Sequence, residues 1–229
     1  MPTLKEFDLD IPYPQRDGSP EDYKVNWKQK RVQFRNEIRC IASLYERNFE
    51  KYKTADTWKV LIECVDEVTD SRVLDLLGVC TTQVQFNVDS FFSMSDHQKK
   101  ETTLELLRKG IDRIVSEKNW DPSPFAIAFE EIIKAEMKNE WFWRKPISSP
   151  DRRFKARLYI VHEVTVVKGY LIVFDKTNQE ILRIEVFNDR PNEWAYVSYL
   201  GKIQWISSKE VALFNKKGEL VRQVSLSSG

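Results

Sequence analysis

The sequence predicts an α+β protein in which helices dominate the first part of the chain and antiparallel strands the last. Before about Pro150 the apolar residues mostly recur at helical spacing, except in one strand-like stretch over residues 58–92. After Pro150 they alternate with polar residues, and turn sequences such as Lys168-Gly169 break them into short runs. Such a change of period, from 3.6 residues to 2, is typical of this fold class.

One continuous unit is the expected organisation. A length of 229 residues with 41% apolar residues is enough for one large domain or two small ones. We expect residues 1–20 to form an irregular arm and residues 21–229 a single domain. In that domain a long helix, a small antiparallel sheet and two central helices pack on a C-terminal antiparallel meander. If the chain divides, the link at 146–152 is the expected boundary.

A long amphipathic helix should follow the arm, with Ser19 as N-cap and Pro20 at the first helical position. It should reach about Tyr52, because one narrow apolar stripe includes Trp27, Phe34, Ile38, Ile41, Tyr45 and Phe49. A basic stripe runs beside it, formed by Lys24, Lys28, Arg31, Arg35 and Arg39. This basic face could bind nucleic acid or anionic lipid. The alternative is that these side chains flank the buried stripe and extend into water.

The strand-like stretch predicts three strands of an antiparallel meander, at about 58–64, 73–80 and 84–92. The alternative for the first of them is a continuation of the helix. Two amphipathic helices should follow. Ser95 and Gln98 have the spacing of a capping box, which begins a helix that ends near Asn119. The next helix begins after Pro122 and should reach about Trp143, shortly before a run of prolines and serines.

The C-terminal part predicts about six strands from Phe154 onward. The expected turns are Lys168-Gly169, the segment 175–179, the loop 188–192 and the sequence Asn-Lys-Lys-Gly at 215–218. Residues 194–200, which follow the loop 188–192, are expected to be one of the strands.

No sequence motif points to catalysis, and no catalytic residue, bound metal or cofactor is expected. The chain has 2 histidines, 3 cysteines and only 7 glycines. It contains no His-Glu-x-x-His, Cys-x-x-Cys, glycine-rich phosphate loop or Gly-x-Ser-x-Gly sequence. Cys40, Cys64 and Cys80 have the spacing of neither a disulfide framework nor a zinc site, which indicates a reducing compartment. No apolar run is long enough to cross a membrane, so a cytoplasmic protein is expected.

Carboxylates are concentrated in one segment, at Glu63, Asp66, Glu67 and Asp70, with Asp75 and Asp89 nearby. Three interpretations are open. The segment could be a solvated loop, a docking surface for a basic protein, or the Mg²⁺ site of a metal-dependent hydrolase. The formal net charge of +1 gives the chain no general attraction to nucleic acid or anionic membranes.

Trp141, Phe142 and Trp143 are consecutive, so at least one ring should point away from the buried face of the expected helix. Exposed tryptophans commonly anchor protein interfaces, and Trp141 or Trp143 is therefore a candidate anchor. Alternatively, the rings seal the junction between the helices and the sheet.

Three segments of the sequence resemble bacterial immunity proteins of polymorphic toxin systems. They are Asn-Glu-Trp-Phe-Trp-Arg-Lys-Pro at 139–146, Ser-Pro-Asp-Arg-Arg-Phe at 149–154 and Tyr-Leu-Gly-Lys-Ile-Gln-Trp-Ile at 199–206. The resemblance implies a protein that neutralises a toxin by binding over it. Because no defined signature carries the resemblance, it assigns no role to an individual residue.

Overall fold

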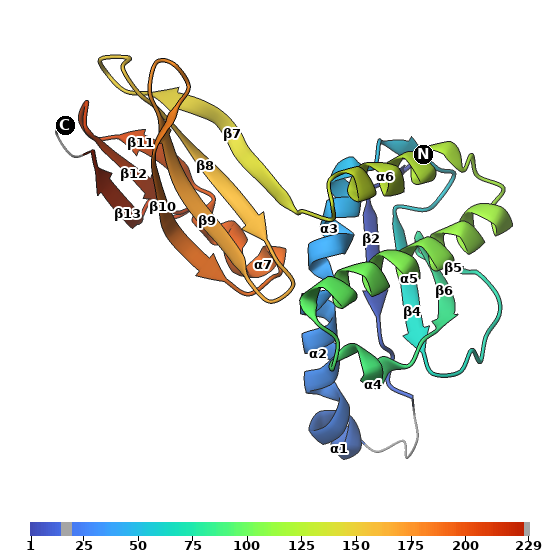
Figure 1. The fold of residues 1–229 in the computed structure, drawn as a ribbon. Helices are drawn as coiled ribbons and strands as arrows, with labels where there is room; N and C mark the ends of the chain where they lie inside the picture. The colour runs from blue at the N-terminus through green and yellow to red at the C-terminus, as the bar shows by residue number, and fades with distance from the viewer. Residues whose placement is uncertain (15–19, 227–229) are drawn as a thin grey trace. The chain divides into compact units, whose positions relative to one another are not determined.

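The computed structural model describes residues 1–14 and 20–226, and the chain divides into two compact units, Met1–Lys138 and Asn139–Gly229 (Figure 1). Each unit has its own hydrophobic cluster, and the mixture of helices and sheets confirms the α+β class. The division lies at Lys138, and residues 146–148 of the expected link belong to a strand instead. Ser19, the expected N-cap, is outside the described residues.

The first unit is built on a mixed sheet with the strand order β2-β4-β6-β5. The strands are β2 (Glu6–Asp10), β4 (Lys59–Val65), β6 (Val79–Gln85) and β5 (Leu74–Leu76). Strands β2, β4 and β6 are parallel, and only β5 runs antiparallel to its neighbour. The predicted antiparallel meander is therefore wrong, because alternation within one strand carries no information about the direction of its neighbours. The expected irregular arm supplies β2, together with β1 (Thr3–Leu4), which pairs with β3 (Tyr52–Lys53).

Two local signals shorten the predicted strands. Leu77 and Gly78 have φ angles of 53° and 81°, and together they form the tight turn between β5 and β6. Asn87 accepts a hydrogen bond from Ser90 N at 3.2 Å, which caps the short helix α4 (Val88–Phe91). The third predicted strand therefore ends at Gln85, and residues 88–91 are helical instead.

The long N-terminal helix is present but bent. It begins as α1 (Pro20–Asp22), continues through a π-helical turn (Tyr23–Trp27) and forms α2 (Lys28–Glu37) and α3 (Arg39–Asn48). The predicted apolar stripe is confirmed, because its members from Phe34 to Tyr45 are buried. The helix ends at Asn48, four residues before the predicted end.

Helices cover one face of this sheet. Figure 1 shows α5 (Asp96–Glu117) lying across β4 and β6, and α3 and α6 (Ser123–Lys134) contribute to the same hydrophobic cluster. The predicted capping box is confirmed at Ser95 and Gln98. On the opposite face, β4 and β6 carry half-buried residues that include Glu63 and Gln83.

The second unit consists of two antiparallel sheets that share one hydrophobic cluster. The four-stranded sheet contains β7 (Glu140–Ser148), β8 (Lys155–His162), β9 (Val167–Phe174) and β10 (Glu180–Asp189). The three-stranded sheet contains β11 (Lys202–Trp205), β12 (Glu210–Phe214) and β13 (Leu220–Ser225). The predicted C-terminal antiparallel strands are confirmed, with the exception described next.

Two predicted elements of this region are wrong. Helix α6 ends at Lys134, because Glu136 and Met137 both have positive φ angles, and residues 140–148 form a strand. Residues 194–200 are mostly helical, in α7 (Glu193–Tyr196) and a 3₁₀ turn (Val197–Tyr199). Asn192 caps α7 by accepting a hydrogen bond from Ala195 N at 3.0 Å.

Candidate functional site

A pocket of about 450 Å³ opens at the carboxyl ends of the parallel strands β2, β4 and β6. Residues 12–14 follow β2, Asp66 and Glu67 follow β4, and Val88 follows β6, and all of these residues line the pocket. Ligands of proteins with parallel sheets commonly bind just outside the carboxyl ends of the strands. The position of this pocket therefore makes it the candidate site of the first unit.

Three of the four predicted acidic residues line the pocket: Glu63, Asp66 and Glu67. Glu63 is half-buried near the end of β4 and accepts a hydrogen bond from Gln83 Nε2 at 3.3 Å. Asp66 is exposed and accepts a hydrogen bond from Val88 N at 3.3 Å, and Glu67 is also exposed. The acidic segment is thus gathered at one edge of the sheet.

Asp70 does not line the pocket and has a local partner. Its Oδ2 atom lies 2.7 Å from Arg72 Nη2, and the hydrogen bonds from Arg72 lower the pKa of Asp70 to about 2. The loop before it is attached to the sheet, because Gln83 Oε1 accepts hydrogen bonds from Thr69 N at 2.9 Å and Asp70 N at 3.1 Å. Of the two neighbouring carboxylates, Asp75 pairs with Lys118 at 2.8 Å and Asp89 with Lys30 at 2.7 Å.

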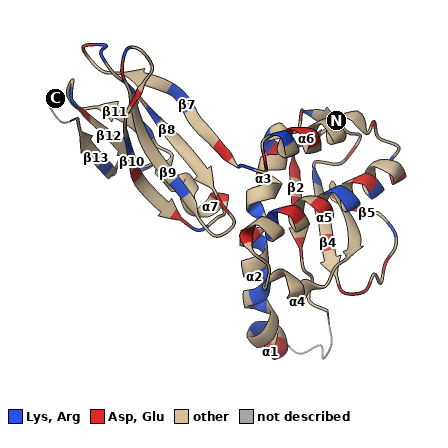
Figure 2. Ribbon diagram, in the orientation of Figure 1, with Lys and Arg blue, Asp and Glu red and all other residues tan. Residues whose placement is uncertain are grey.

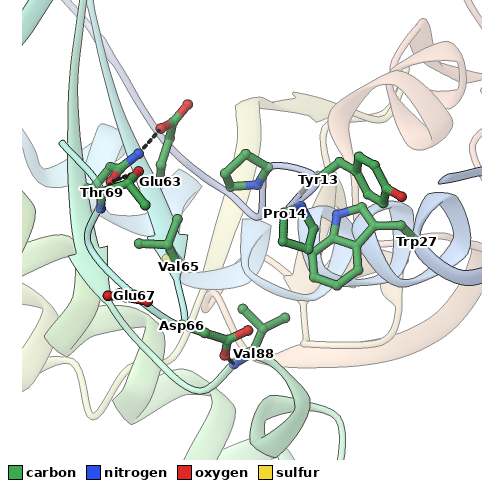
Figure 3. A pocket seen from close by; sticks show the side chains of 12 residues that line it. Tyr13, Pro14, Trp27, Glu63, Val65, Asp66, Glu67, Thr69 and Val88 are labelled. Carbon is green, nitrogen blue, oxygen red and sulfur yellow. Dashed lines mark hydrogen bonds between the residues drawn. The ribbon is translucent and has the colours of Figure 1, made fainter. Parts of the chain in front are cut away.

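Aromatic residues form the opposite wall of the pocket. Figure 3 shows Tyr13, Pro14 and Trp27 on one side and Glu63, Asp66 and Glu67 on the other. The Trp27 indole N–H donates to Ile11 O at 3.1 Å, and the rings of Tyr13 and Trp27 meet edge to face at 6.3 Å. The half-buried Trp27 ring is therefore held in place. We call Tyr13, Trp27, Glu63, Asp66 and Glu67 the acidic–aromatic cleft.

A smaller hollow of about 200 Å³ extends the cleft. It shares Tyr13, Trp27 and Asp66 with the larger pocket and adds Asp22 and Asp89. The Tyr13 hydroxyl donates to Asp22, and Lys30 Nζ lies 5.9 Å from the centroid of the Trp27 ring. The ammonium group of Lys30 therefore lies near the face of the Trp27 ring, where the ring and the neighbouring carboxylate of Asp89 both attract a cation.

Sequence reasoning missed both aromatic members of the cleft. The spacing of the apolar residues places Trp27 in the buried stripe, and Tyr13 belongs to the segment that the sequence predicts to be irregular. The alternating sequence Phe7-Asp8-Leu9-Asp10 is the signal that could have identified β2 and placed Tyr13 at its carboxyl end.

Figure 2 shows basic positions along α2 and acidic positions on β2. Three residues of the predicted basic stripe, Arg31, Arg35 and Arg39, lie within ion-pair distance of Asp8 or Asp10 of β2. Arg31 Nε donates to Asp10 Oδ1 at 2.8 Å, and this hydrogen bond raises the pKa of Arg31. Arg35 lies 3.8 Å from Asp8, and Arg39 pairs with Glu46 at 2.9 Å. This pairing gives the stripe a structural role, because it neutralises carboxylates that are themselves nearly buried.

The two candidate anchor tryptophans lie in the second unit, on strand β7. Successive residues of a strand point to opposite faces, so Trp141 and Trp143 share one face, and both pack partly buried against the hydrophobic cluster. Phe142 points to the other face and is 37% exposed. The most exposed aromatic residue of this unit is Trp194, at 91%, which the prediction did not single out.

Within residues 1–14 and 20–226, no three His, Cys, Asp or Glu side chains are placed to hold a metal ion. His97 lies 3.3 Å from Glu101 in α5, and His162 is buried with Nε2 3.2 Å from Pro191 O. In the same part of the chain, no helix combines the length and apolar character that crossing a membrane requires.

Comparisons of this chain with protein-family models, with curated proteins and with solved structures found no match.

Proposed function

We propose that this protein is a binding protein that receives a basic segment of a protein partner in the acidic–aromatic cleft. The observation that supports this proposal is the convergence of Glu63, Asp66 and Glu67 with the Trp27 ring around one pocket. Grouped carboxylates accelerate the approach of a basic partner, and an aromatic ring face attracts a cation that has lost its water.

An arginine side chain matches the cleft better than a lysine does. Its planar guanidinium group can stack on Trp27 while it donates two parallel hydrogen bonds to one carboxylate. The volume of about 450 Å³ is within the range of roughly 300–1,000 Å³ that is common for ligand pockets. The partner should therefore carry an arginine in an exposed, positively charged segment.

An immunity-type inhibitor is the specific form of this proposal. Such a protein neutralises a toxin by covering its surface, so it requires affinity and no catalytic residues. A basic toxin domain would have the charge that complements the cleft. We place the protein in the cytoplasm, since Cys40, Cys64 and Cys80 are buried thiols, as is usual where thiols stay reduced.

Titration with a hexa-arginine peptide tests the charge and ring chemistry of the cleft. We expect the peptide to bind, hexalysine to bind more weakly, and the affinity for both to fall as salt is added. The triple variant Glu63→Gln, Asp66→Asn, Glu67→Gln should lose about tenfold or more in affinity, or about 1.4 kcal/mol. Trp27→Leu should weaken the binding of hexa-arginine more than the binding of hexalysine.

The matched control changes three exposed carboxylates of α5, as Glu101→Gln, Glu105→Gln and Glu117→Gln. This control variant alters the net charge by the same amount and should bind both peptides as tightly as the unmodified protein does. Equal losses in the two triple variants would show that only net charge matters and would contradict the proposal. With a partner captured from lysate, the cleft variant should associate more slowly and with less dependence on salt.

A further inference from the structure

A separate hollow, of about 540 Å³, lies entirely within the second unit. Its charged lining residues are Arg144, Lys202 and Lys216, and none of the described residues that line it is acidic. Leu200 and Phe214 add apolar surface. The charge of this hollow is therefore opposite to that of the acidic–aromatic cleft, and it attracts anions rather than cations.

An irregularity in strand β7 sets the backbone conformation of Arg144. The pairing of β7 with β8 shifts register between Trp143 and Ile147, and Arg144 has a φ angle of 60° within that bulge. Bulges often redirect a side chain at functional positions, and a positive φ angle is unfavourable for arginine. The guanidinium group lies 4.4 Å from the centroid of the Trp143 ring, and Arg144 O accepts a hydrogen bond from Arg157 Nε at 2.8 Å.

The segments that carry Lys202 and Lys216 are held against each other. A Cβ atom at Gly201 would lie 2.2 Å from the backbone of Asn215, so only glycine permits this approach. Lys216 N donates to Ser198 O at 2.9 Å, and Asn215 Oδ1 accepts from the backbone N–H of Lys217 at 2.9 Å. The backbone that positions both lysines is therefore set before any ligand arrives.

None of the three cations forms an ion pair with a residue that the structure describes, whereas Lys30, Arg31 and other cations of the first unit do. We infer that this hollow binds a ligand that carries phosphoryl groups. A phosphoryl ligand supplies the two or more negative charges that three cations match. The guanidinium group provides paired donors and the ammonium groups provide point charges. This inference is independent of the function proposed for the cleft.

Calorimetric titration of the full chain with pyrophosphate, ADP and adenosine tests the inference. We expect pyrophosphate and ADP to bind, with affinity that falls as salt is added, and adenosine not to bind. A higher affinity for ADP than for pyrophosphate would assign the nucleoside to Leu200 and Phe214, and equal affinities would limit recognition to the phosphoryl groups. Arg144→Gln, Lys202→Gln and Lys216→Gln should each weaken pyrophosphate binding by fivefold or more.

Lys176→Gln is the matched control, because Lys176 is an exposed lysine in the turn after β9. It should bind pyrophosphate as the unmodified protein does. Arg144→Gln could disturb the bulge, but Lys216→Gln changes only a side chain on an exposed turn and should keep the unfolding midpoint unchanged. The inference is wrong if millimolar pyrophosphate produces no binding heat, if adenosine binds as tightly as ADP, or if Lys216→Gln binds no more weakly than Lys176→Gln.

Discussion

The backbone N–H of Phe7 donates a hydrogen bond to Glu46 Oε1 at 3.0 Å, between residues 39 positions apart in the sequence. Phe7 lies in β2, the edge strand of the sheet, and Glu46 lies in α3. The N–H groups of Leu9 and Ile11 donate to the carboxylates of Asp8 and Asp10. Carboxylates thus occupy the amides of this edge, where another strand could otherwise pair.

Replacing Glu46 should destabilise the first unit. Glu46→Ala leaves a nearly buried amide of β2 without its acceptor, and we expect the free energy of unfolding to fall by about 1–3 kcal/mol. Both variants lose the ion pair with Arg39, but Glu46→Gln keeps an oxygen acceptor for the amide and should lose less than half of that amount. Urea unfolding followed by circular dichroism measures both values. Equal stability of the two variants would show that the hydrogen bond to Phe7 contributes nothing.

Gly110 of α5 allows the helix to approach strand β4. A Cβ atom there would lie 2.4 Å from Ile62 Cγ1, so Gly110→Ala should lower the free energy of unfolding by about 1–3 kcal/mol. In an Ile62→Ala background the same change should lower it far less, since the clashing atoms are gone. Gly218→Ala is the control: its φ angle is 83° with no atom near the added carbon, so its effect should not depend on Ile62. Identical losses for Gly110→Ala in both backgrounds would rule out the contact.

The lowered pKa of Asp151 predicts a contribution to the free energy of unfolding that disappears in acid. Hydrogen bonds from Ser149 and Arg153 lower its pKa from 3.8 to about 2. A lowered pKa in the folded state stabilises the protein fully above pH 3.8, and this contribution is lost as the pH falls toward 2. Asp151→Asn should therefore lower the thermal unfolding midpoint at pH 7 and have little effect near pH 2. Carbon-13 NMR titration of Asp151 measures the pKa directly, and an ordinary value would contradict the prediction.

The two hydrophobic clusters predict that fragments 1–138 and 139–229 fold separately. All buried members of one cluster lie within residues 4–132, and all those of the other lie within 156–224. Each fragment should unfold cooperatively in urea and give dispersed amide signals in an NMR spectrum. A fragment that remains unfolded alone would instead support the single continuous domain expected from the sequence.

The positions of the predicted site residues show which features of the site a local sequence pattern can predict. Glu63, Asp66 and Glu67 are close in sequence, so their gathering at one edge of the sheet could be expected before the structure. The orientation of Trp141 and Trp143 could not, because it depends on whether residues 140–148 form a helix or a strand. In β7 both rings point to the same buried side, whereas a helix would have separated them.

By itself, the sequence determined the α+β class, the buried stripe from Phe34 to Tyr45, the capping box at Ser95 and most of the C-terminal strands. These features follow from periodicity and from hydrogen bonds between residues a few positions apart, and both are local. Only the tertiary structure decided that β2, β4 and β6 are parallel and that Tyr13 and Trp27 face the acidic segment. Strand direction and pocket composition depend on pairing between distant segments, because the path of the connecting helix, rather than any local pattern, sets which strand ends meet.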